Sequence, residues 1–429
     1  MTPSDRAPLD SSLSHTASRR DLLRAAGGAS LAALGLASAD RPAAAADPKQ
    51  AAAAAGSSAT PSPISQAWSF PTTHYPTPGK TFRIGVVSAA IKGKPQKLNG
   101  HTWHFANGLH PECDLAKVKK YKDPGSAGIF ERYFRNPRTN FDIVPFPDTR
   151  ITCVYDADPT AQEMYCEAFP GVKIVRSLEE MMPQVDAIFM GDASGYGEDH
   201  YDLVAPGLEA GKPTFCDKPI GGTIEQTRKI LKLAEDRKTP LMSSSLYRHQ
   251  WGTDQALRYR DSKEYGERTF AMCSQAGGHN TDRWLVYGQH PTWMIVTLCG
   301  AGAKAVNMVE YKDMCHVMVT YEDRAPAEIW CGRPDMTHRY CHSQIHFEKK
   351  KREEGFEGMY EWTPAIDGEY WLGHHYQMVR LQQAFVGMCR TGIEPVPHQE
   401  ILEVTAIIHA ALKSRDEKSR FVELAEVLG

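Results

Sequence analysis

The chain has 429 residues, of which 41% are hydrophobic and 24% charged, and its formal net charge at pH 7 is -3. This near-neutral balance argues against a nucleic-acid-binding protein and against one that docks on a membrane surface. The ten cysteines stand singly and form no CxxC pair, so their spacing predicts buried thiols rather than a disulfide framework.

The first 46 residues have the pattern of an export signal. Ser18–Leu23 contains a pair of arginines, a weakly apolar run follows from Ala25 to Ala39, and small residues at 43–46 form a cleavage zone. The run is too short and too weakly apolar for a membrane span, so the pattern predicts twin-arginine export to the periplasm or the extracellular space. A disordered Ala-rich tail would explain the composition but not the paired arginines.

Residues 47–78 are rich in Ala, Ser, Pro and Gly, which is typical of a linker or of an arm lying on the surface. The roughly 350 residues that follow are too many for one ordinary domain and sufficient for two. Changes of pattern divide them into a domain over 79–246 and a second domain over 247–429. The dense basic run at 348–354 has acidic residues at both ends and predicts a solvated loop.

The first buried strand is predicted over Thr81–Ser88, a largely apolar run. A dinucleotide-binding fold would place G-x-G-x-x-G directly after it, but the chain reads SAAIKG at 88–93. Only the last glycine remains, so this loop is expected to approach a diphosphate less closely than usual. Its predicted cofactor-binding residues are Ser88, Ala90, Ile91 and Gly93.

Residues 94–147 fit no simple strand–helix–strand step and are interpreted as an insertion. They contain His101, His104, His110 and Cys113, whose spacing could serve a metal. Because no paired or acidic ligand set accompanies them, loop histidines that line or cover the site are the favoured interpretation, and no metal is predicted.

A second strand is predicted over Arg150–Asp156. Asp158 and Pro159 then supply the N-cap and the first residue of a helix that ends at Phe169. A carboxylate at the tip of the second strand is where an adenine ribose hydroxyl binds in a dinucleotide-binding sheet. Asp156 is therefore a predicted cofactor-binding residue, and a plain turn residue is the alternative.

Strands and helices then alternate as in a doubly wound parallel sheet. Strands are expected over Val185–Met190, Pro213–Cys216 and Leu241–Ser245, a helix over His200–Ala210, and helix caps at Ser177 and Thr223. Gly191 and Asp192 follow the first of these strands, and Asp217 and Lys218 follow the second. Open α/β sheets bind ligands at the carboxyl ends of their strands, so these four residues are predicted to contact the cofactor. An exposed lysine on a surface loop is the alternative for Lys218.

Several short motifs accompany this sheet. EAGK at 209–212 precedes the strand that ends in Asp217-Lys218-Pro219, Leu246–Arg248 follows the last strand, and RTGIEP at 390–395 and AALKS at 410–414 stand near the end. Together they resemble the Gfo/Idh/MocA family of oxidoreductases, the glucose-fructose oxidoreductase and inositol dehydrogenase group. That family has Glu-Lys-Pro where this chain has Asp217-Lys218-Pro219. The resemblance covers most of residues 80–429. It implies an NAD or NADP cofactor, with Lys218 and Arg248 at the site.

From Gly266 onward the pattern changes to alternating strands, expected over Thr269–Gln275, Ala303–Tyr311, Met314–Tyr321, Ala325–Cys331 and Tyr340–Phe347. The expected fold class is α/β: an N-terminal Rossmann doubly wound parallel sheet and a C-terminal α+β domain with a large, open, mostly antiparallel sheet. Such a sheet can leave one face uncovered. The resemblance implies that a homo-oligomer forms through this open face.

The resemblance also indicates a catalytic histidine. In this part of the chain the family carries Asp-x-x-x-His, in which the His accepts a proton from a sugar hydroxyl and the Asp holds the substrate and tunes the base. His290 stands in the matching position, before a helix, but Val286 occupies the place of the Asp. Tyr287 and Asp282 are the candidates to replace it. A capping or packing role is the alternative for His290.

An aromatic stretch at 370–376 is expected to precede a helix with an apolar face. His374 and His375 within it suit either sugar binding or a protein interface, and they are candidate substrate contacts.

The expected function is an exported oxidoreductase that moves hydride between a tightly bound NAD or NADP and a hydroxyl of a sugar or sugar derivative. His290 would take the proton and Lys218 would stabilise charge on the oxygen. Two alternatives stay open. Some family members cleave glycosidic bonds by transient oxidation, and a non-catalytic sugar-binding homologue would suit the lost glycines and the missing Asp. The expected partner is a small carbohydrate, without nucleic acid or a membrane span.

Overall fold

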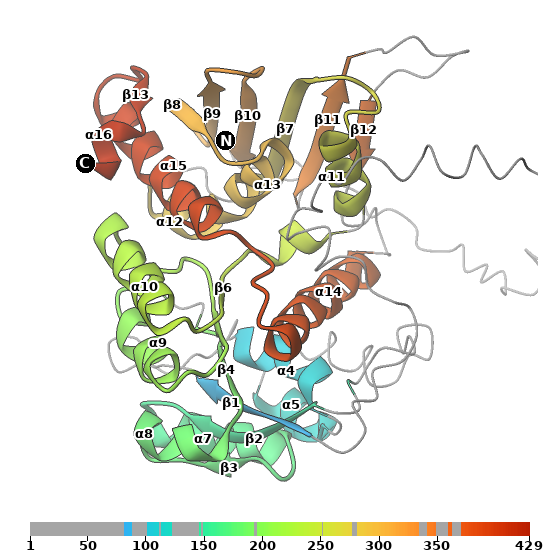
Figure 1. Ribbon diagram of the computed structural model, residues 1–429, viewed down its shortest axis with the longest axis vertical. Helices are drawn as coiled ribbons and strands as arrows, with labels where there is room; N and C mark the ends of the chain where they lie inside the picture. Colours follow the sequence, from blue (N-terminus) through green and yellow to red (C-terminus); the bar gives the residue numbers. More distant parts are fainter. Residues whose placement is uncertain are drawn as a thin grey trace, which may run out of the picture. The chain divides into compact units, whose positions relative to one another are not determined.

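The structure is a computed structural model (Figure 1). It describes residues 81–87, 101–110, 113–121, 146, 149–192, 195–250, 252–276, 281–333, 341–348, 359–362 and 370–429. The predicted export signal and linker lie outside these ranges, and so do Ser88, Ala90, Ile91 and Gly93.

A six-stranded sheet forms the first part of the fold, in the order β3-β2-β1-β4-β5-β6. Its strands are β1 (Phe82–Val87), β2 (Thr149–Tyr155), β3 (Lys173–Ile174), β4 (Ala187–Met190), β5 (Thr214–Cys216) and β6 (Leu241–Met242). All neighbouring strands are parallel, so the predicted doubly wound parallel sheet is confirmed. The chain moves outward from β1 to β3 and then returns to β4 on the other side of β1. The carboxyl ends of β1 and β4 therefore border the point where the strand order reverses.

The helices around this sheet are α4 (His101–Leu109), α5 (Leu115–Tyr121), α7 (Pro159–Ala168), α8 (Leu178–Met181), η1 (Met182–Gln184), α9 (His200–Glu209), α10 (Ile224–Arg237) and η2 (Leu246–His249). Three predicted N-caps are confirmed by side-chain hydrogen bonds. Asp158 accepts the N–H of Thr160, and the caps of α8 and α10, Ser177 and Thr223, each accept an N–H three residues later. The caps explain why these helices start where the sequence indicates.

The segment predicted as a loop-like insertion contains two helices, which corrects that expectation. His101 and His104 lie on α4, and His110 directly follows it. Trp103 holds α4 against the sheet layer, because its buried ring meets Tyr165 of α7 edge-on with ring centroids 5.4 Å apart. His110 bonds the carbonyl of Pro170 through Nε2, so it lies away from the strand ends. His101 and His110 therefore do not act as one group.

A seven-stranded sheet forms the second part, in the order β12-β11-β7-β10-β9-β8-β13. Its strands are β7 (Arg268–Ala276), β8 (Ala303–Tyr311), β9 (Met314–Tyr321), β10 (Ala327–Gly332), β11 (His342–Phe347), β12 (Met359–Trp362) and β13 (Val422–Glu423). The sheet is mostly antiparallel, as expected, and only its β7–β10 pair is parallel.

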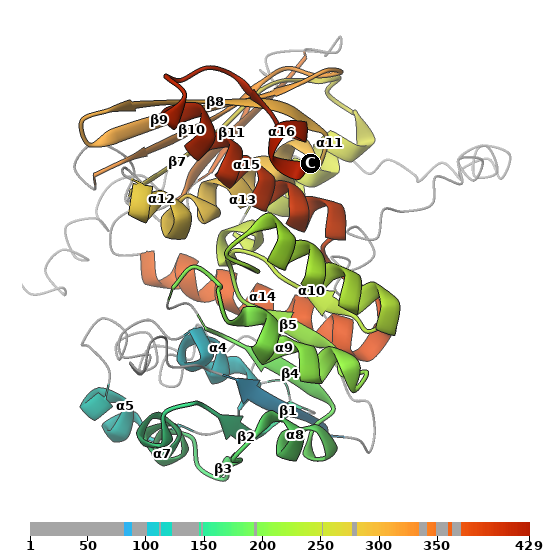
Figure 2. The ribbon, with the colours of Figure 1, turned by 90° about the vertical axis from the view of Figure 1, so that its left-hand side faces the viewer.

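The helices of this part are α11 (Thr253–Ser262), α12 (Thr281–Tyr287), α13 (Gln289–Cys299), α14 (Tyr370–Thr391), α15 (His398–Asp416) and α16 (Ala425–Leu428). α13 and α15 pack under one face of the seven-stranded sheet (Figure 2). On β9 the side chains of Val317 and Val319 are buried toward these helices, whereas Met318 and Thr320 are half-buried on the other face. There the rings of His316 and Trp330 stack 4.0 Å apart. The predicted alternation of the strand is confirmed.

One C-terminal helix belongs to the core of the first sheet. Phe189 of β4 and Phe215 of β5 stack with their ring centroids 4.4 Å apart, and Phe385 of α14 meets Phe189 edge-on at 5.3 Å. α14 also crosses α4 closely at Gly108, where an added Cβ would lie 1.7 Å from Gln382 Oε1. The apolar face predicted for this helix is confirmed, because Met378, Leu381, Phe385 and Met388 of α14 are all buried.

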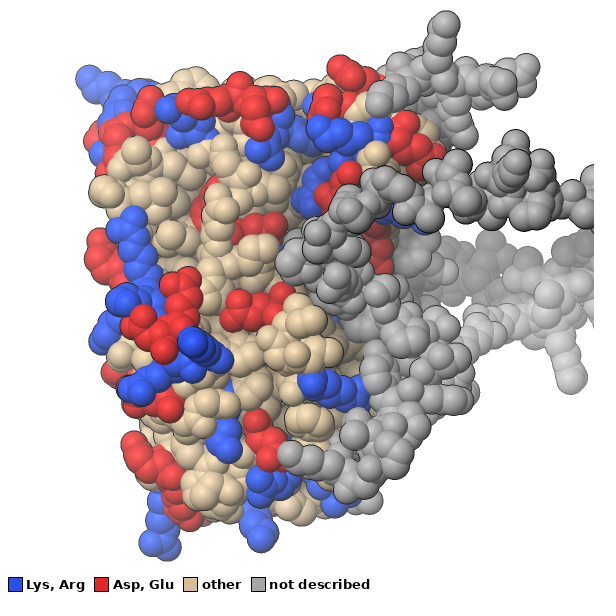
Figure 3. Space-filling model, in the orientation of Figure 1, with Lys and Arg blue, Asp and Glu red and all other residues tan. Residues whose placement is uncertain are grey.

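Basic and acidic side chains are interspersed over the described surface seen in Figure 3, in agreement with the balanced composition. None of the helices in the described ranges is long and apolar enough to cross a bilayer. All ten cysteines are free, and seven of them are buried, as the sequence predicts.

His398, the first residue of α15, connects that helix to the end of α10. Its Nδ1 lies 3.0 Å from Glu235 Oε1 and its Nε2 lies 3.1 Å from Glu394 Oε1. Burial lowers the pKa of His398, but the hydrogen bonds and charges of Glu394 and Glu235 outweigh burial and raise the pKa above its ordinary value. The imidazole is therefore more basic in the folded chain than in the unfolded one.

This shift makes the contribution of His398 to stability dependent on pH. Because the folded-state pKa is raised, the contribution is fully present below the ordinary histidine pKa and is lost as pH rises through the folded-state pKa. We expect His398→Gln to lower the free energy of unfolding by about 1 kcal/mol at about pH 5.5 and by less at about pH 8. Urea unfolding at both pH values measures this difference. Equal losses at the two pH values would contradict the prediction. Glu235→Gln removes one of the two carboxylates that raise the pKa of His398, so it should also make the stability less dependent on pH.

Candidate active site

The first component of the site is the segment that leaves β5. The backbone N–H of Asp217 donates to the Met190 carbonyl of β4 at 3.1 Å, which continues the sheet by one residue. Asp217 Oδ1 accepts the N–H of Lys218 at 2.7 Å, and the Lys218–Pro219 peptide bond is cis. Only 1% of Asp217 and 4% of Lys218 is exposed, so the alternative of an exposed lysine on a surface loop is wrong.

Lys218 is a buried ammonium group beside a carboxylate. Burial lowers its pKa, and the charge of Asp217 opposes this effect. Among the residues that the structure describes, none accepts a hydrogen bond from its Nζ. A cation held in this way is suited to bind a ligand oxygen on which negative charge develops.

His101, the first residue of α4 and one of the histidines that the sequence places as lining or covering the site, reaches the segment after β5. Its Nδ1 lies 2.5 Å from Asp217 Oδ2. The N–H of Thr102 donates to the Gly191 carbonyl at 3.2 Å, and an added Cβ at Gly191 would lie 2.4 Å from the Thr102 nitrogen. Gly191 therefore permits the N-terminus of α4 to lie against the end of β4. The only sequence signal for this contact was the histidine itself.

Two of the predicted cofactor carboxylates lie at the same edge of the sheet. Asp156 follows β2 directly, is 4% exposed, and accepts the N–H of Asp158 at 2.8 Å. Since Tyr155 pairs with Val87, Asp156 lies beside the carboxyl end of β1. Asp192 follows β4 and is fully buried.

The described residues fit a dinucleotide. The N-terminus of α4 lies at the reversal of strand order, where an open α/β sheet binds a diphosphate, and Asp156 stands where a ribose hydroxyl binds. Asp156, the N-terminus of α4 and Lys218 would hold the cofactor.

The second component is His290, the second residue of α13, which is 7% exposed. Its Nδ1 lies 2.6 Å from Ser245 Oγ, and the same oxygen accepts the N–H of Tyr247 at 3.2 Å. The ring of Tyr247 meets the imidazole edge-on at 4.9 Å. These contacts fix the orientation of the imidazole, which is the arrangement that a general base needs.

The sheet brings the two components to one edge. Lys218 follows β5, and Ser245, which holds His290, follows β6. β5 and β6 are neighbouring parallel strands, so their carboxyl ends lie on the same side of the sheet. The structure thus places His290 and Lys218 at a common edge, although they are far apart in sequence.

Arg248 has a structural contact. It is fully buried, and its Nη1 donates to Thr297 Oγ1 and to Glu400 Oε2, each at 2.7 Å. These bonds connect η2 to α13 and α15. The expected contact of Arg248 with the cofactor stays a prediction.

The remaining candidates are only partly described. Tyr287 is the half-buried last residue of α12, and Val286, in the place of the family's Asp, is also half-buried. The side chains of Asp282, His374 and His375 lie outside the described part of the structure. The stretch at 370–376 forms the first turns of α14 rather than preceding the helix, which corrects the expectation.

Comparison with known proteins agrees with this geometry. A family model, GFO_IDH_MocA, described as an oxidoreductase family with an NAD-binding Rossmann fold, matches residues 128–245. An inositol 2-dehydrogenase of Rhizobium meliloti is 35% identical over 97 residues, which are 22% of this chain and 28% of that protein. A dTDP-3,4-didehydro-2,6-dideoxy-alpha-D-glucose 3-reductase of Saccharopolyspora spinosa is 28% identical over 125 residues, 28% of this chain and 36% of that protein. These matches span well under half the length of either relative.

Solved structures share the whole fold. An apo scyllo-inositol dehydrogenase from Lactobacillus casei has a TM-score of 0.59 at 14% identity, covering 81% of this chain and 99% of that one. A myo-inositol dehydrogenase from Corynebacterium glutamicum has a TM-score of 0.57 at 16% identity, covering 80% and 99%. At these identities the likeness establishes the fold. Residues 128–245 therefore match the Gfo/Idh/MocA oxidoreductase family with its NAD-binding Rossmann fold, and the chain shares the fold of the inositol dehydrogenases named above.

Proposed function

We propose that the protein is an oxidoreductase that moves hydride between a tightly bound nicotinamide cofactor and a hydroxyl of a sugar or sugar derivative. The strongest support is that buried Lys218 and oriented His290 lie at the same edge of a Rossmann sheet. The names of the similar proteins, which act on inositols or a deoxysugar, point to the same class of substrate.

Each residue has a definite task in this reaction. His290, oriented through Ser245, takes the proton of the substrate hydroxyl at its other ring nitrogen, Nε2. Lys218 orients that hydroxyl and stabilises the charge that develops on its oxygen. When bound, the nicotinamide supplies the acceptor or donor of hydride. Val286 cannot provide the carboxylate that tunes the histidine elsewhere in the family, and Ser245 provides a neutral partner instead.

The decisive experiment asks first whether the protein carries a cofactor. The purified full-length protein is denatured, and the supernatant is analysed for nicotinamide by absorbance and mass. We expect NAD or NADP to be released. If none is released, and the folded protein binds none on addition, the proposal is wrong and a non-catalytic sugar-binding protein is favoured. Incubation of the loaded protein with polyols and glycosides then separates oxidation of the hydroxyl from cleavage of the glycosidic bond.

A positioning role for Ser245 gives a separate prediction. We expect Ser245→Ala to lower kcat on the order of 10-fold to 100-fold with a smaller effect on KM, and to shift the pH profile of kcat, because the imidazole loses its orienting partner. Ser243 provides the matched control, since its buried hydroxyl has no hydrogen-bond partner among the described residues. Ser243→Ala should leave kcat and its pH profile unchanged. A Ser245→Ala enzyme with the wild-type profile would contradict the role.

We further propose that the protein is exported by the twin-arginine route, on the basis of the arginine pair and the apolar run that follows it. Replacing Arg19 and Arg20 with lysine should retain the protein in the cytoplasm of the expressing cell, and unchanged export would contradict this. We also propose a homo-oligomer. The face of the seven-stranded sheet that carries half-buried His316, Met318 and Trp330 could pack against a second copy of the chain. Light scattering tests that proposal, and Met318→Glu should shift the mass toward the monomer.

A further inference from the structure

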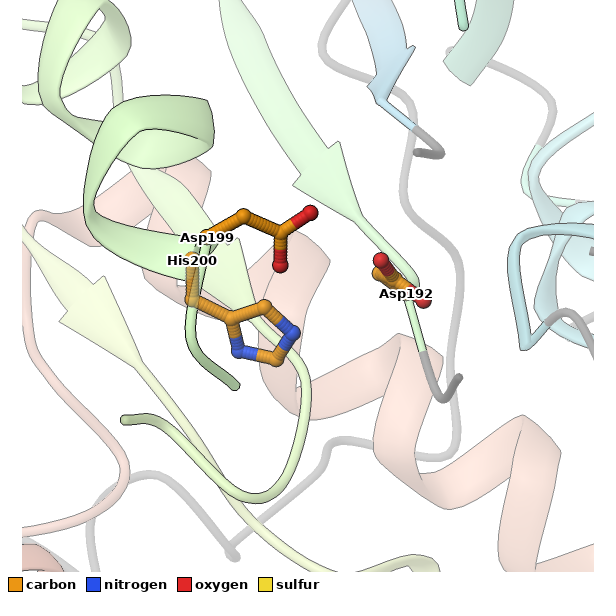
Figure 4. A group of neighbouring side chains, drawn as sticks. All are labelled: Asp192, Asp199 and His200. Carbon is orange, nitrogen blue, oxygen red and sulfur yellow. The ribbon is translucent and has the colours of Figure 1, made fainter. Parts of the chain in front are cut away.

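A group of three potential ligands lies beside the proposed active site. Asp192 follows β4, and Asp199 and His200 stand at the start of α9. One ligand atom from each lies within 4.8 Å of the other two. Asp192 is 0% exposed, His200 is 1% exposed and Asp199 is half-buried, so the group is not a set of solvated surface acids. Figure 4 shows the carboxylate of Asp199 and the imidazole of His200 turned toward Asp192.

Asp199 does not perform the task that its position suggests. It is the N-cap residue of α9, where an aspartate ordinarily accepts a backbone N–H of the first turn, but its side chain makes no capping bond. Its Oδ1 is buried and accepts no hydrogen bond from any residue that the structure describes. The carboxylate therefore faces inward, and the first turn of α9 lacks the capping hydrogen bond that this side chain could provide.

His200 is held in an orientation that suits a ligand. Its Nδ1 lies 3.8 Å from Cys216 Sγ, and the imidazole forms a hydrogen bond with the backbone of Pro219. Figure 4 shows one ring nitrogen of His200 on the side that faces Asp192, with the Asp199 carboxylate above the same ring edge. Metal-binding histidines are commonly held in this way, with one nitrogen on a backbone group and the other on the ion.

The backbone that carries Asp199 and His200 is firmly positioned. Gly197 has φ +83, and an added Cβ there would lie 2.7 Å from the Pro219 carbonyl oxygen, so this turn packs directly against the segment after β5. The Glu198 carbonyl accepts a bond of 2.8 Å from Gln226 Nε2 of α10. The three groups are thus brought together by the fold rather than by a flexible surface loop.

Two inward carboxylates so close together repel each other unless a proton or a cation lies between them. A shared proton would satisfy the carboxylates but would give the directed imidazole no role. A cation bound by one atom of each residue would give both carboxylates and the imidazole a common partner. We propose that Asp192, Asp199 and His200 bind a divalent metal ion.

The chemistry of the donors defines the class of ion. Two carboxylates and one imidazole suit Mn²⁺ or Zn²⁺ better than a soft ion such as Cu⁺, which prefers thiolates. Three protein ligands leave at least one coordination position for water or for a hydroxyl oxygen. Because the site joins the end of β4 to the start of α9 next to Cys216 and Asp217, the ion would stabilise the strand ends that hold the active site. This inference is independent of the proposed reaction.

The test measures metal binding by the full-length protein after treatment with a chelator. Mn²⁺ is added, and the electron paramagnetic resonance signal of free Mn²⁺ is followed; Zn²⁺ is then added in competition. We expect the wild type to bind one ion. Asp199→Asn and His200→Gln should weaken binding at least about 10-fold to 100-fold. Asp202→Asn, on the exposed side of the same helix, is the matched control and should bind as the wild type does.

The outcomes are distinct. A wild-type protein that removes no free Mn²⁺ and shows no heat of binding with Zn²⁺ overturns the proposal and favours a shared proton. Equal binding by Asp199→Asn and wild type also overturns it. Thermal unfolding of the chelated proteins checks the fold, and if His200→Gln does not fold, Asp199→Asn carries the test because that residue is only half-buried. Detection of nicotinamide in the same preparations keeps this result separate from the proposed function.

Discussion

Replacing Lys218 with methionine is expected to lower the rate of hydride transfer by about 100-fold to 1000-fold while leaving the fold intact. Methionine keeps most of the volume and the apolar stem but removes the buried cation that stabilises charge on the substrate oxygen. The native ammonium is expensive to bury, and no described residue accepts a hydrogen bond from its Nζ. The substitution should therefore not reduce stability. The rate is measured as the change in nicotinamide absorbance in a single turnover, and stability by thermal unfolding.

Lys212 provides the control for this experiment. It precedes the same strand, β5, at the opposite end and is half-buried. Lys212→Met should retain wild-type turnover. If Lys218→Met also retains it, with cofactor bound, then the segment after β5 is not part of the catalytic machinery. If Lys218→Met is inactive because the protein unfolds, Lys218→Arg, which keeps the charge, should fold and have reduced activity.

Breaking the Arg248–Glu400 pair is expected to have the largest effect on stability. Arg248 is completely buried, with 0% of its surface exposed, and Glu400 is 6% exposed. Arg248→Met would leave the Glu400 carboxylate buried without its partner at 2.7 Å. We expect a loss of about 3 to 5 kcal/mol in the free energy of unfolding, measured by urea denaturation.

A double substitution separates the pair from the packing around it. Arg248→Met combined with Glu400→Leu removes both charges and should recover most of the lost stability, because well-packed apolar residues replace buried ion pairs with little cost. The exposed pair of Lys232 and Asp236 on α10 is the comparison, and Lys232→Met should change the stability by less than about 1 kcal/mol. A small loss for Arg248→Met would show that the buried pair contributes little.

Much of the fold could be predicted from local patterns. The apolar runs that form β1, β2 and β4 are bounded by turns, and their limits in the structure agree within about two residues. Three helix starts could be predicted from the N-cap residues Asp158, Ser177 and Thr223, because capping depends only on neighbouring residues. β9 alternates between half-buried and buried residues along its whole length, and the observed limits of both β8 and β9 are the predicted ones.

The features that could not be predicted depend on contacts between distant segments. Nothing near His101 in the sequence shows that the first residue of α4 contacts Asp217. That contact depends on Gly191, where the absence of a side chain lets the N-terminus of α4 pack against the end of β4. Arg248 follows the last strand of the first sheet, where a cofactor contact was a reasonable expectation, but its partner Glu400 is 152 residues away. Asp199 reads as an ordinary helix cap, and only the fold reveals that its carboxylate turns inward.

The contact of Phe385 with the first sheet has a consequence for how the chain folds during synthesis. The stacked rings of Phe189 and Phe215 are complete only when α14 covers them, and α14 begins more than a hundred residues after β6. A nascent chain that has released only the first sheet from the ribosome therefore exposes this aromatic surface to water. The aromatic core of the first sheet is therefore completed only after α14 has been synthesised, so the last stage of its folding depends on a segment that follows the second sheet in sequence.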